Sequence, residues 1–215
     1  MIRVIVADDH AVVRQGLKQI VAQVPDMEIV GEAGTGDETM AVVRDVPADI
    51  LVLDLSMPGF GALEALREVR HLRPNLSVLI LSVHSPAQYG IRMLRGGASG
   101  YLTKESAPDE LILAIRKVVA GGKYLSQEMA EKLAEHVSHG AEDKPHEGLS
   151  DREFHILRLL ALGKKVSEIA EELALSPKTI STYRRRALEK LNLNTNADIT
   201  QYALREGLIG PDKTA

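Results

Sequence analysis

The feature that most restricts the fold of this chain is a repeated alternation of short apolar runs with segments of helical periodicity. The apolar runs predict strands at Ile2–Ala7, Met27–Ala33, Ile50–Leu53, Val78–Leu81 and Gly100–Leu102. Apolar residues three and four positions apart predict helices between and after them, at Ala11–Val24, Thr39–Val46, Leu63–Leu72, Tyr89–Leu94 and Pro108–Ala120. The third and fourth runs are apolar throughout, which is typical of parallel strands that are buried on both faces. The pattern therefore predicts an α/β domain with a five-stranded parallel sheet, doubly wound by helices on both faces.

The remainder of the chain changes character twice. Residues 123–148 include Gly140, Pro145 and Gly148 among charged residues, and they predict a linker with one helix at Glu128–Val137. The segment after it carries no strand signal and predicts four helices, at Arg152–Leu162, Val166–Leu173, Pro177–Leu191 and Asn196–Arg205. We therefore expect an α/β domain at 1–122, a linker at 123–148 and an all-α domain at 149–210.

Local signals mark where the helices of the all-α domain begin. Ser150 with Glu153 three residues later forms the pattern of a capping box. Ser176 followed by Pro177 is typical of a cap and first turn. A short helix, a tight turn and a longer helix predict a helix-turn-helix.

Charge and composition exclude several classes of protein. Residues 149–215 carry 11 Lys/Arg against 9 Asp/Glu, whereas residues 1–148 carry 15 against 21. The mildly basic C-terminal part indicates a polyanionic partner. No run of about 18 apolar residues is present, so no membrane partner is expected, and the acidic start does not resemble a signal peptide. The absence of cysteine excludes disulfide and thiol chemistry and suits a cytoplasmic location.

Polar side chains follow four of the five predicted strands: Asp8 and Asp9, then Asp54, Ser82 and Lys104. The carboxyl ends of parallel strands meet at one edge of a sheet, so these side chains should lie together. Three neighbouring carboxylates repel one another unless a cation lies among them, and their oxygen atoms suit Mg²⁺. Asp54 lies between the others in strand order, which favours it as a nucleophile that accepts a phosphoryl group. Lys104 and Ser82 would contact the phosphoryl oxygens; each residue alone would be ordinary for a turn or a solvated surface.

The segments that carry these residues resemble the receiver domains of NarL/FixJ two-component response regulators. The matching text is Val6-Ala7-Asp8-Asp9-His10, Leu53-Asp54-Leu55-Ser56-Met57-Pro58-Gly59, Leu81-Ser82-Val83 and Gly100-Tyr101-Leu102-Thr103-Lys104. The resemblance implies a flavodoxin-like, CheY-like receiver that a sensor histidine kinase phosphorylates on Asp54. One departure is Gly61-Ala62, where such chains usually carry Asp-Gly or Gly-Gly after the Pro-Gly pair.

The resemblance also implies a role for each residue of the site. Asp9 would bind Mg²⁺ directly and Asp8 largely through water, with Asp54 and the backbone carbonyl of Ser56 as further ligands. Ser82 would follow the phosphoryl group inward, and Tyr101 would act as a switch that changes rotamer with it.

The predicted helix Pro177–Leu191 has two distinct faces. Its apolar stripe comprises Ile180, Ala187, Leu188 and Leu191. The other face offers hydroxyl, ammonium and guanidinium groups, on Lys178, Thr179, Ser181, Thr182, Arg184, Arg185, Arg186 and Lys190. Arg185 is the best candidate for a bidentate contact with guanine, and Ser181 and Thr182 for shorter base contacts. The other basic residues suit DNA phosphates, although a basic helix alone is as often simply solvated.

The neighbouring segments resemble the LuxR-type DNA-binding domain over its whole length, from Leu149-Ser150-Asp151-Arg152-Glu153 to Tyr202-Ala203-Leu204-Arg205-Glu206-Gly207-Leu208. Ser176–Arg184 is similar to the GacA/UvrY branch. Ser181 and Tyr183 stand where lysine and histidine are frequent, which affects the operator sequence rather than DNA binding itself. The resemblance implies double-stranded DNA as a partner and a homodimer formed on phosphorylation or DNA binding.

The sequence thus predicts a response regulator and not an enzyme. Two alternatives stay open. One is a DNA-binding regulator with a vestigial receiver that does not depend on phosphorylation. The other is a Mg²⁺-dependent phosphohydrolase, which would need a second acid and a substrate lid that the short connections do not provide.

Overall fold

The computed structural model describes residues 1–55, 57, 62–83, 86–106, 108–126, 129–131, 133–134, 144–173 and 175–209. The chain divides into two compact units, Met1–Ala141 and Glu142–Ala215. The helix expected at Glu128–Val137 is described only at 129–131 and 133–134, where the backbone is helical. No helix in the described ranges is long and apolar enough to cross a membrane.

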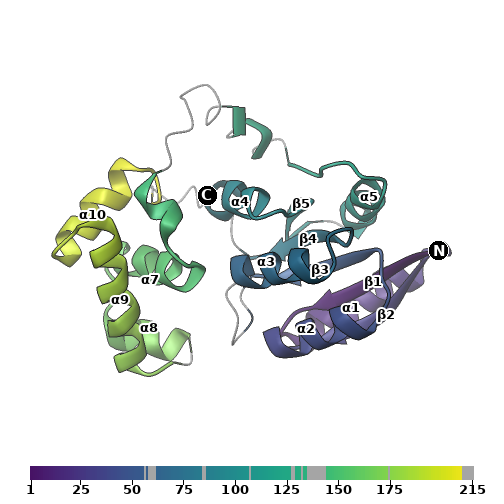
Figure 1. The fold of residues 1–215 in the computed structure, drawn as a ribbon, viewed down its shortest axis with the longest axis horizontal. Coiled ribbons are helices and arrows are strands. Elements are labelled where there is room, and N and C mark those ends of the chain that lie inside the picture. Colours follow the sequence, from purple (N-terminus) through teal and green to yellow (C-terminus); the bar gives the residue numbers. More distant parts are fainter. Residues whose placement is uncertain are drawn as a thin grey trace. The chain divides into compact units, whose positions relative to one another are not determined.

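The first unit contains a five-stranded, all-parallel sheet with the strand order β2-β1-β3-β4-β5 (Figure 1). The strands are β1 (Ile2–Ala7), β2 (Met27–Ala33), β3 (Ile50–Asp54), β4 (Ser77–Ser82) and β5 (Gly100–Thr103). The predicted fold class is confirmed, because this is the doubly wound order in which the connection reverses direction between β1 and β3. The central strand β3 pairs with β1 on one side and β4 on the other.

Five helices alternate with these strands: α1 (Ala11–Ala22), α2 (Gly36–Asp45), α3 (Ala62–Leu72), α4 (Pro86–Arg95) and α5 (Pro108–Val119). The prediction for the second helix began three residues too late, at Thr39. In the structure the Thr35 side chain accepts a hydrogen bond from the backbone N–H of Glu38 and caps the helix there. Because the first turn holds polar residues, hydrophobic periodicity alone could not detect it.

The sheet separates two apolar cores. Side chains such as Val6, Val52 and Leu79 form one buried cluster with residues of α1 and α5. Alternate strand residues point to the opposite face, where α2, α3 and α4 contribute the fully buried Val43, Leu66 and Met93. The strands β3 and β4 are therefore apolar on both sides, and their polar residues are confined to the strand ends.

The second unit is helical, with η1 (Pro145–Gly148), α7 (Asp151–Ala161), α8 (Val166–Glu172), α9 (Pro177–Leu191) and α10 (Asn196–Arg205). The capping box of Ser150 and Glu153 is confirmed, as is the cap that Ser176 provides for α9. The apolar stripe of α9 is buried as predicted, at Ile180, Ala187, Leu188 and Leu191. The η1 turn also packs within this unit, because His146 Nδ1 lies 2.9 Å from the Tyr202 hydroxyl.

The core packing of α3 gives a direct test of the fold. Leu66→Ala should lower the free energy of unfolding of the first unit by about 2–5 kcal/mol, because it removes fully buried methyl groups and leaves a cavity. The matched change Leu113→Ala removes a side chain that is 60% exposed on α5, so its effect should stay within about 0.5 kcal/mol. Urea denaturation measures both; equal losses would show that α3 does not pack as described.

Candidate functional site

The carboxyl ends of β1 and β3 bring three carboxylates together. Asp8 and Asp9 directly follow β1, and Asp54 is the last residue of β3. Because Ala7 pairs with Leu53 in register, the two strands end at the same level. One ligand atom from each of Asp8, Asp9, Asp54 and the neighbouring His10 lies within 4.8 Å of the others. The predicted convergence of the three acids is therefore observed.

Lys104 supplies a positive charge to this group. Its Nζ lies 2.7 Å from Asp8 Oδ2 and 3.0 Å from Asp54 Oδ2. Its backbone N–H donates to the carbonyl of Ser82 at 2.8 Å, which holds the end of β5 beside the end of β4. Burial alone lowers the pKa of Lys104, but the hydrogen bond and charge of Asp8 and Asp54 outweigh it, so the pKa lies above its ordinary value. The lysine is therefore a permanent cation at neutral pH.

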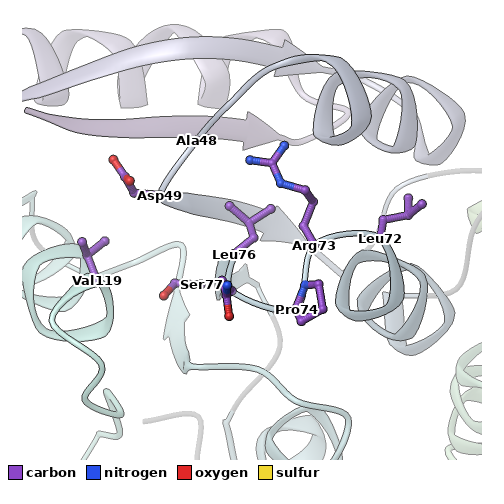
Figure 2. A pocket seen from close by; sticks show the side chains of 9 residues that line it. Ala48, Asp49, Leu72, Arg73, Pro74, Leu76, Ser77 and Val119 are labelled. Carbon is purple, nitrogen blue, oxygen red and sulfur yellow. The ribbon is translucent and has the colours of Figure 1, made fainter.

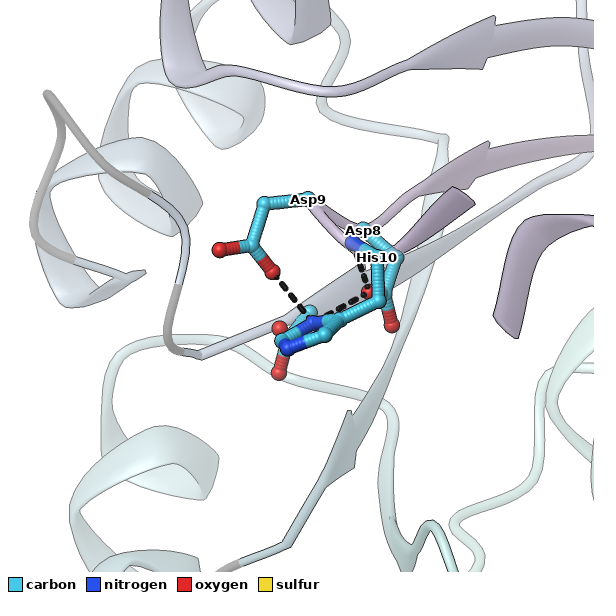
Figure 3. A group of neighbouring side chains, drawn as sticks. Asp8, Asp9 and His10 are labelled. Carbon is cyan, nitrogen blue, oxygen red and sulfur yellow. Dashed lines mark hydrogen bonds and ion pairs between the residues drawn. The ribbon is translucent and has the colours of Figure 1, made fainter. Parts of the chain in front are cut away.

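The acids differ in their exposure to solvent. Asp8 and Asp54 are buried, at 1% and 2% exposure, whereas the Asp9 side chain is 29% exposed. Figure 3 shows Asp9 beside His10 and Asp8 on the loop that follows β1. Asp9 therefore lies at the rim of the group, where it can meet an ion that arrives from solvent, and Asp54 lies at its base.

His10 is a member of this group that the sequence reasoning did not single out. Its Nδ1 lies 2.6 Å from Asp9 Oδ1 and 3.2 Å from Asp8 Oδ1, and its backbone N–H donates to Asp8 Oδ1 at 2.8 Å. It precedes the first residue of α1. Its position directly after the acidic pair was the available signal. The contact with the backbone N–H fixes the orientation of the Asp8 carboxylate.

The remaining expected residues lie at or next to the same edge. Ser82 ends β4 and Tyr101 lies within β5, and both are completely buried. Ser56 falls outside the described residues, as does the loop before α3 where the sequence departs from the family pattern.

The group fits a hard divalent cation. Three carboxylates face a single ammonium group, so the group carries excess negative charge. The donors on the acids are oxygen atoms, which bind cations of the magnesium type. The excess charge and the donor chemistry therefore agree with the expected metal site.

A hollow lies at the other end of the strands, and no cluster of carboxylates lines it. It measures about 360 Å³ and is lined by Ala48, Asp49, Leu72, Arg73, Pro74, Asn75, Leu76, Ser77 and Val119 (Figure 2). Three of its polar side chains already bond to backbone atoms. Arg73 donates to the Val43 carbonyl at 3.0 Å, and Asp49 accepts from the Arg3 N–H at 2.7 Å. The Ser77 hydroxyl donates to the Val118 carbonyl at 3.1 Å. We therefore place the candidate site at the acidic edge.

In the second unit, α9 presents most of the predicted polar residues away from its buried stripe. Lys178, Ser181, Arg185, Arg186 and Lys190 are exposed, and Thr179, Thr182 and Arg184 are half-buried. Arg185 Nη1 donates to Glu189 Oε1 at 3.0 Å one turn along the helix. Arg184 Nε donates to Oδ1 of Asn196, the first residue of α10, at 2.6 Å. Both guanidinium groups are therefore oriented by a polar neighbour.

Lys190 has a partner inside its own unit. Its Nζ lies 2.7 Å from Glu153 Oε2 and 3.4 Å from the Gly148 carbonyl oxygen. Burial raises the pKa of Glu153, but the hydrogen bonds from Lys190 and Ser150 outweigh it and leave the pKa below its usual value. Glu153 is therefore ionised at neutral pH, and the Lys190 ammonium connects α9 to the start of α7.

Two family models match the chain. The model described as "Response regulator receiver domain" matches residues 4–116. The model described as "Bacterial regulatory proteins, luxR family" matches residues 147–203. Together they include every described residue of the acidic group and the whole of α9.

Similar proteins extend over nearly the whole chain. Response regulator UvrY of Escherichia coli K12 is 36% identical over 97% of this chain and 96% of its own length. Response regulator GacA of Pseudomonas aeruginosa is 36% identical over 97% of this chain and 98% of its own length.

Solved structures of the response regulator RcsB are also similar. RcsB of Salmonella typhimurium, studied for its conformational dynamism in DNA interaction, is 28% identical over 95% of this chain and 98% of that one, with a TM-score of 0.59. RcsB of Salmonella enterica serovar Typhimurium, bound to the promoter rprA in the presence of the phosphomimetic BeF3-, is 28% identical over 94% of this chain and 97% of that one, with a TM-score of 0.60. The chain therefore belongs to the NarL/FixJ family of response regulators, in which a receiver domain is joined to a LuxR-type DNA-binding domain.

Proposed function

We propose that a sensor histidine kinase phosphorylates Asp54 and that this controls sequence-specific DNA binding by α9, and through it transcription. The observation that carries the proposal is the position of Asp54: a buried carboxylate at the end of the central strand, 3.0 Å from Lys104 Nζ and grouped with Asp8 and Asp9. No other described group of at least three acidic or histidine side chains converges in this way.

The proposed chemistry is a displacement at phosphorus. A carboxylate oxygen of Asp54 forms a bond to the phosphoryl group of the kinase phosphohistidine as the N–P bond breaks, and the imidazole leaves with the bonding pair. Lys104, already between Asp8 and Asp54, neutralises the transferred oxygens, and the Ser82 hydroxyl donates to one of them. A bound Mg²⁺ would neutralise further charge on the phosphoryl oxygens. Asp8, Asp9, Asp54 and the Ser56 carbonyl would hold it.

The acyl phosphate would change the balance of charges beside Ser82 and Lys104. Because Ser82 ends β4 and Lys104 directly follows β5, their rearrangement would bias α4 and the buried ring of Tyr101 toward a second packing. We propose that this second arrangement favours a homodimer. In such a dimer the α9 helices of the two subunits would be related by a twofold axis. That arrangement suits DNA half-sites about one helical turn apart.

We propose that α9 reads the major groove. Arg185 is the base-reading residue, because its pair with Glu189 is exposed and weak enough to exchange for guanine. Thr179, Ser181 and Thr182 line the same helix with shorter groups. The residues that would contact phosphates are Lys178, Arg184, Arg186 and Lys190. Arg184 is oriented by Asn196, and Lys190 is paired with Glu153. The DNA-bound structures of RcsB support this role for the shared fold.

We assign the receiver to residues 1–122, the linker to 123–148 and the DNA-binding domain to 149–210, in a cytoplasmic protein. The two family models fall inside the receiver and, apart from residues 147–148, inside the DNA-binding domain.

The phosphoacceptor assignment predicts that Asp54→Ala abolishes phosphate uptake from acetyl phosphate, because the nucleophilic oxygen is removed. Uptake is measured by intact-protein mass spectrometry with Mg²⁺ present. Asp45→Ala is the matched control, because Asp45 is an exposed carboxylate at the end of α2 and should leave uptake unchanged. Normal labelling of the Asp54→Ala protein would refute the assignment.

The division of labour on α9 predicts different effects for two single substitutions. Arg185→Ala should cost about 1–3 kcal/mol on the preferred operator and little on unrelated DNA, because it removes a base contact. Lys178→Ala should weaken both kinds of DNA alike and reduce the dependence of affinity on salt. Fluorescence anisotropy with an operator selected from random DNA separates these outcomes. A uniform loss from Arg185→Ala would mean that it contacts phosphate instead.

A further inference from the structure

The chain that follows α5 returns to the sheet instead of leaving it. The Tyr124 N–H donates to the Ser99 carbonyl at 3.0 Å, and the Tyr101 N–H donates to the Tyr124 carbonyl at 3.2 Å. These bonds form a parallel bridge between Gly100 and Tyr124. The edge of β5 is therefore covered by residues that the sequence pattern assigned to the linker. We call the described residues 123–126 and Met129 the edge segment.

Side chains fasten the edge segment to its surroundings. The Tyr124 hydroxyl donates to Glu110 Oε1 on α5 at 3.0 Å, and Lys117 Nζ lies 5.7 Å from the centre of the Tyr124 ring. Lys123 Nζ donates to the Ala98 carbonyl at 2.7 Å. At Gly100 a Cβ atom would lie 2.9 Å from the Tyr124 carbonyl oxygen, so the close approach requires glycine. The contact between the edge segment and β5 is therefore held by specific interactions of several side chains.

Met129 fastens the far end of the edge segment to α4. Its side chain is completely buried. A Cβ atom built at Gly90 would lie 2.5 Å from Met129 Cε and 3.0 Å from Sδ, so the methionine occupies the space that a side chain at Gly90 would fill. Glycine inside a helix costs about 1 kcal/mol relative to alanine. Close packing of Met129 gives a physical reason for Gly90 in the middle of α4.

The edge segment therefore contacts both elements that phosphorylation is proposed to move. Tyr101 lies three residues before Lys104 on β5, and its own N–H donates to the edge segment. Gly90 lies on α4, the helix that follows Ser82 along the chain. Beyond Met129 the chain continues toward the DNA-binding unit.

We propose that the edge segment, the first part of the linker, transmits the phosphorylation state of Asp54 to the linker residues that follow Met129. When α4 and β5 change their packing, the contact between Met129 and Gly90 changes. The position of the linker residues that follow Met129 changes with it. This inference rests on the proposed function, since it takes phosphorylation of Asp54 as its input. A methionine suits the role, because its unbranched side chain repacks at little cost.

Methyl NMR of the full-length protein tests the proposal. The chain has six methionines, at positions 1, 27, 40, 57, 93 and 129, so selective ¹³C labelling gives a spectrum that single substitutions assign. Beryllium fluoride with Mg²⁺ serves as the probe in place of the phosphoryl group. We expect the Met129 resonance to shift along with those of Met57, near Asp54, and Met93, on α4. Met27 and Met40 lie on β2 and α2 and should not move.

The outcomes separate this proposal from the proposed function. If Met57 shifts and Met129 does not, the acidic site responds but the edge segment is not coupled to it, and the inference is wrong. If no methionine shifts, the site does not take the probe, and both the proposed function and the inference fail. The Asp54→Ala protein should show no shift at any methionine.

A matched pair of variants tests the coupling in function. Met129→Ala should leave the rate of phosphate uptake unchanged but reduce the phosphorylation-dependent gain in DNA affinity by about fivefold or more, the lower range of allosteric coupling. Met40→Ala also removes a buried methionine from the receiver and should preserve the gain. Anisotropy titrations with and without acetyl phosphate measure it. A gain in Met129→Ala equal to that in Met40→Ala would overturn the proposal.

Discussion

The receiver depends on an electrostatic imbalance at one edge of its sheet. Three carboxylates from β1 and β3 face the single ammonium group of Lys104, which bridges Asp8 and Asp54. Charges at such short range inside a protein interact strongly, because little water screens them. Like charges stay this close together only if the backbone that carries them is rigid. The parallel strands β1 and β3, which lie in the buried sheet, provide that rigidity. The same imbalance suits the divalent cation and the added phosphoryl group of the proposed function.

The positions of Lys104 and Ser82 explain how a change at that edge can spread. The two residues are joined by a backbone hydrogen bond at the ends of β5 and β4, so a shift of one moves the other. The edge segment then joins β5, α4 and α5 through Tyr124 and Met129. Packed interiors shift between discrete arrangements and do not deform smoothly. Under the proposed function, these contacts are the path by which a small displacement at the acidic edge would reach the surface of the receiver.

In the second unit, the packing keeps one face of α9 exposed to solvent in a fixed orientation. The stripe of α9 from Ile180 to Leu191 is buried, and Lys190 ties the end of the helix to Glu153 at the start of α7. Glu153 also completes the capping box with Ser150. One buried carboxylate therefore fixes both the first turn of α7 and the last turn of α9. Arg185 and Arg186 remain exposed as a consequence.

The linear pattern of residues determined the α/β class, the parallel sheet, the limits of α9 and α10 and the convergence of Asp8, Asp9, Asp54 and Lys104. These features follow from hydrophobic periodicity, local caps and the rule that strand ends of a parallel sheet share an edge. The receiver motifs, which are specific in combination, also indicated the family of the protein.

Only the tertiary structure revealed the contact of His10 with the acids, the pairing of Lys190 with Glu153 and the return of Tyr124 and Met129 to the receiver. These contacts join residues through the geometry of a loop or between segments far apart in the chain, and periodicity reports only on neighbours along one helix or strand. Tyr124 follows two glycines and precedes a polar stretch, so its local sequence indicates a linker. Its backbone bonds to β5 exist because the sheet leaves an unpaired edge within its reach.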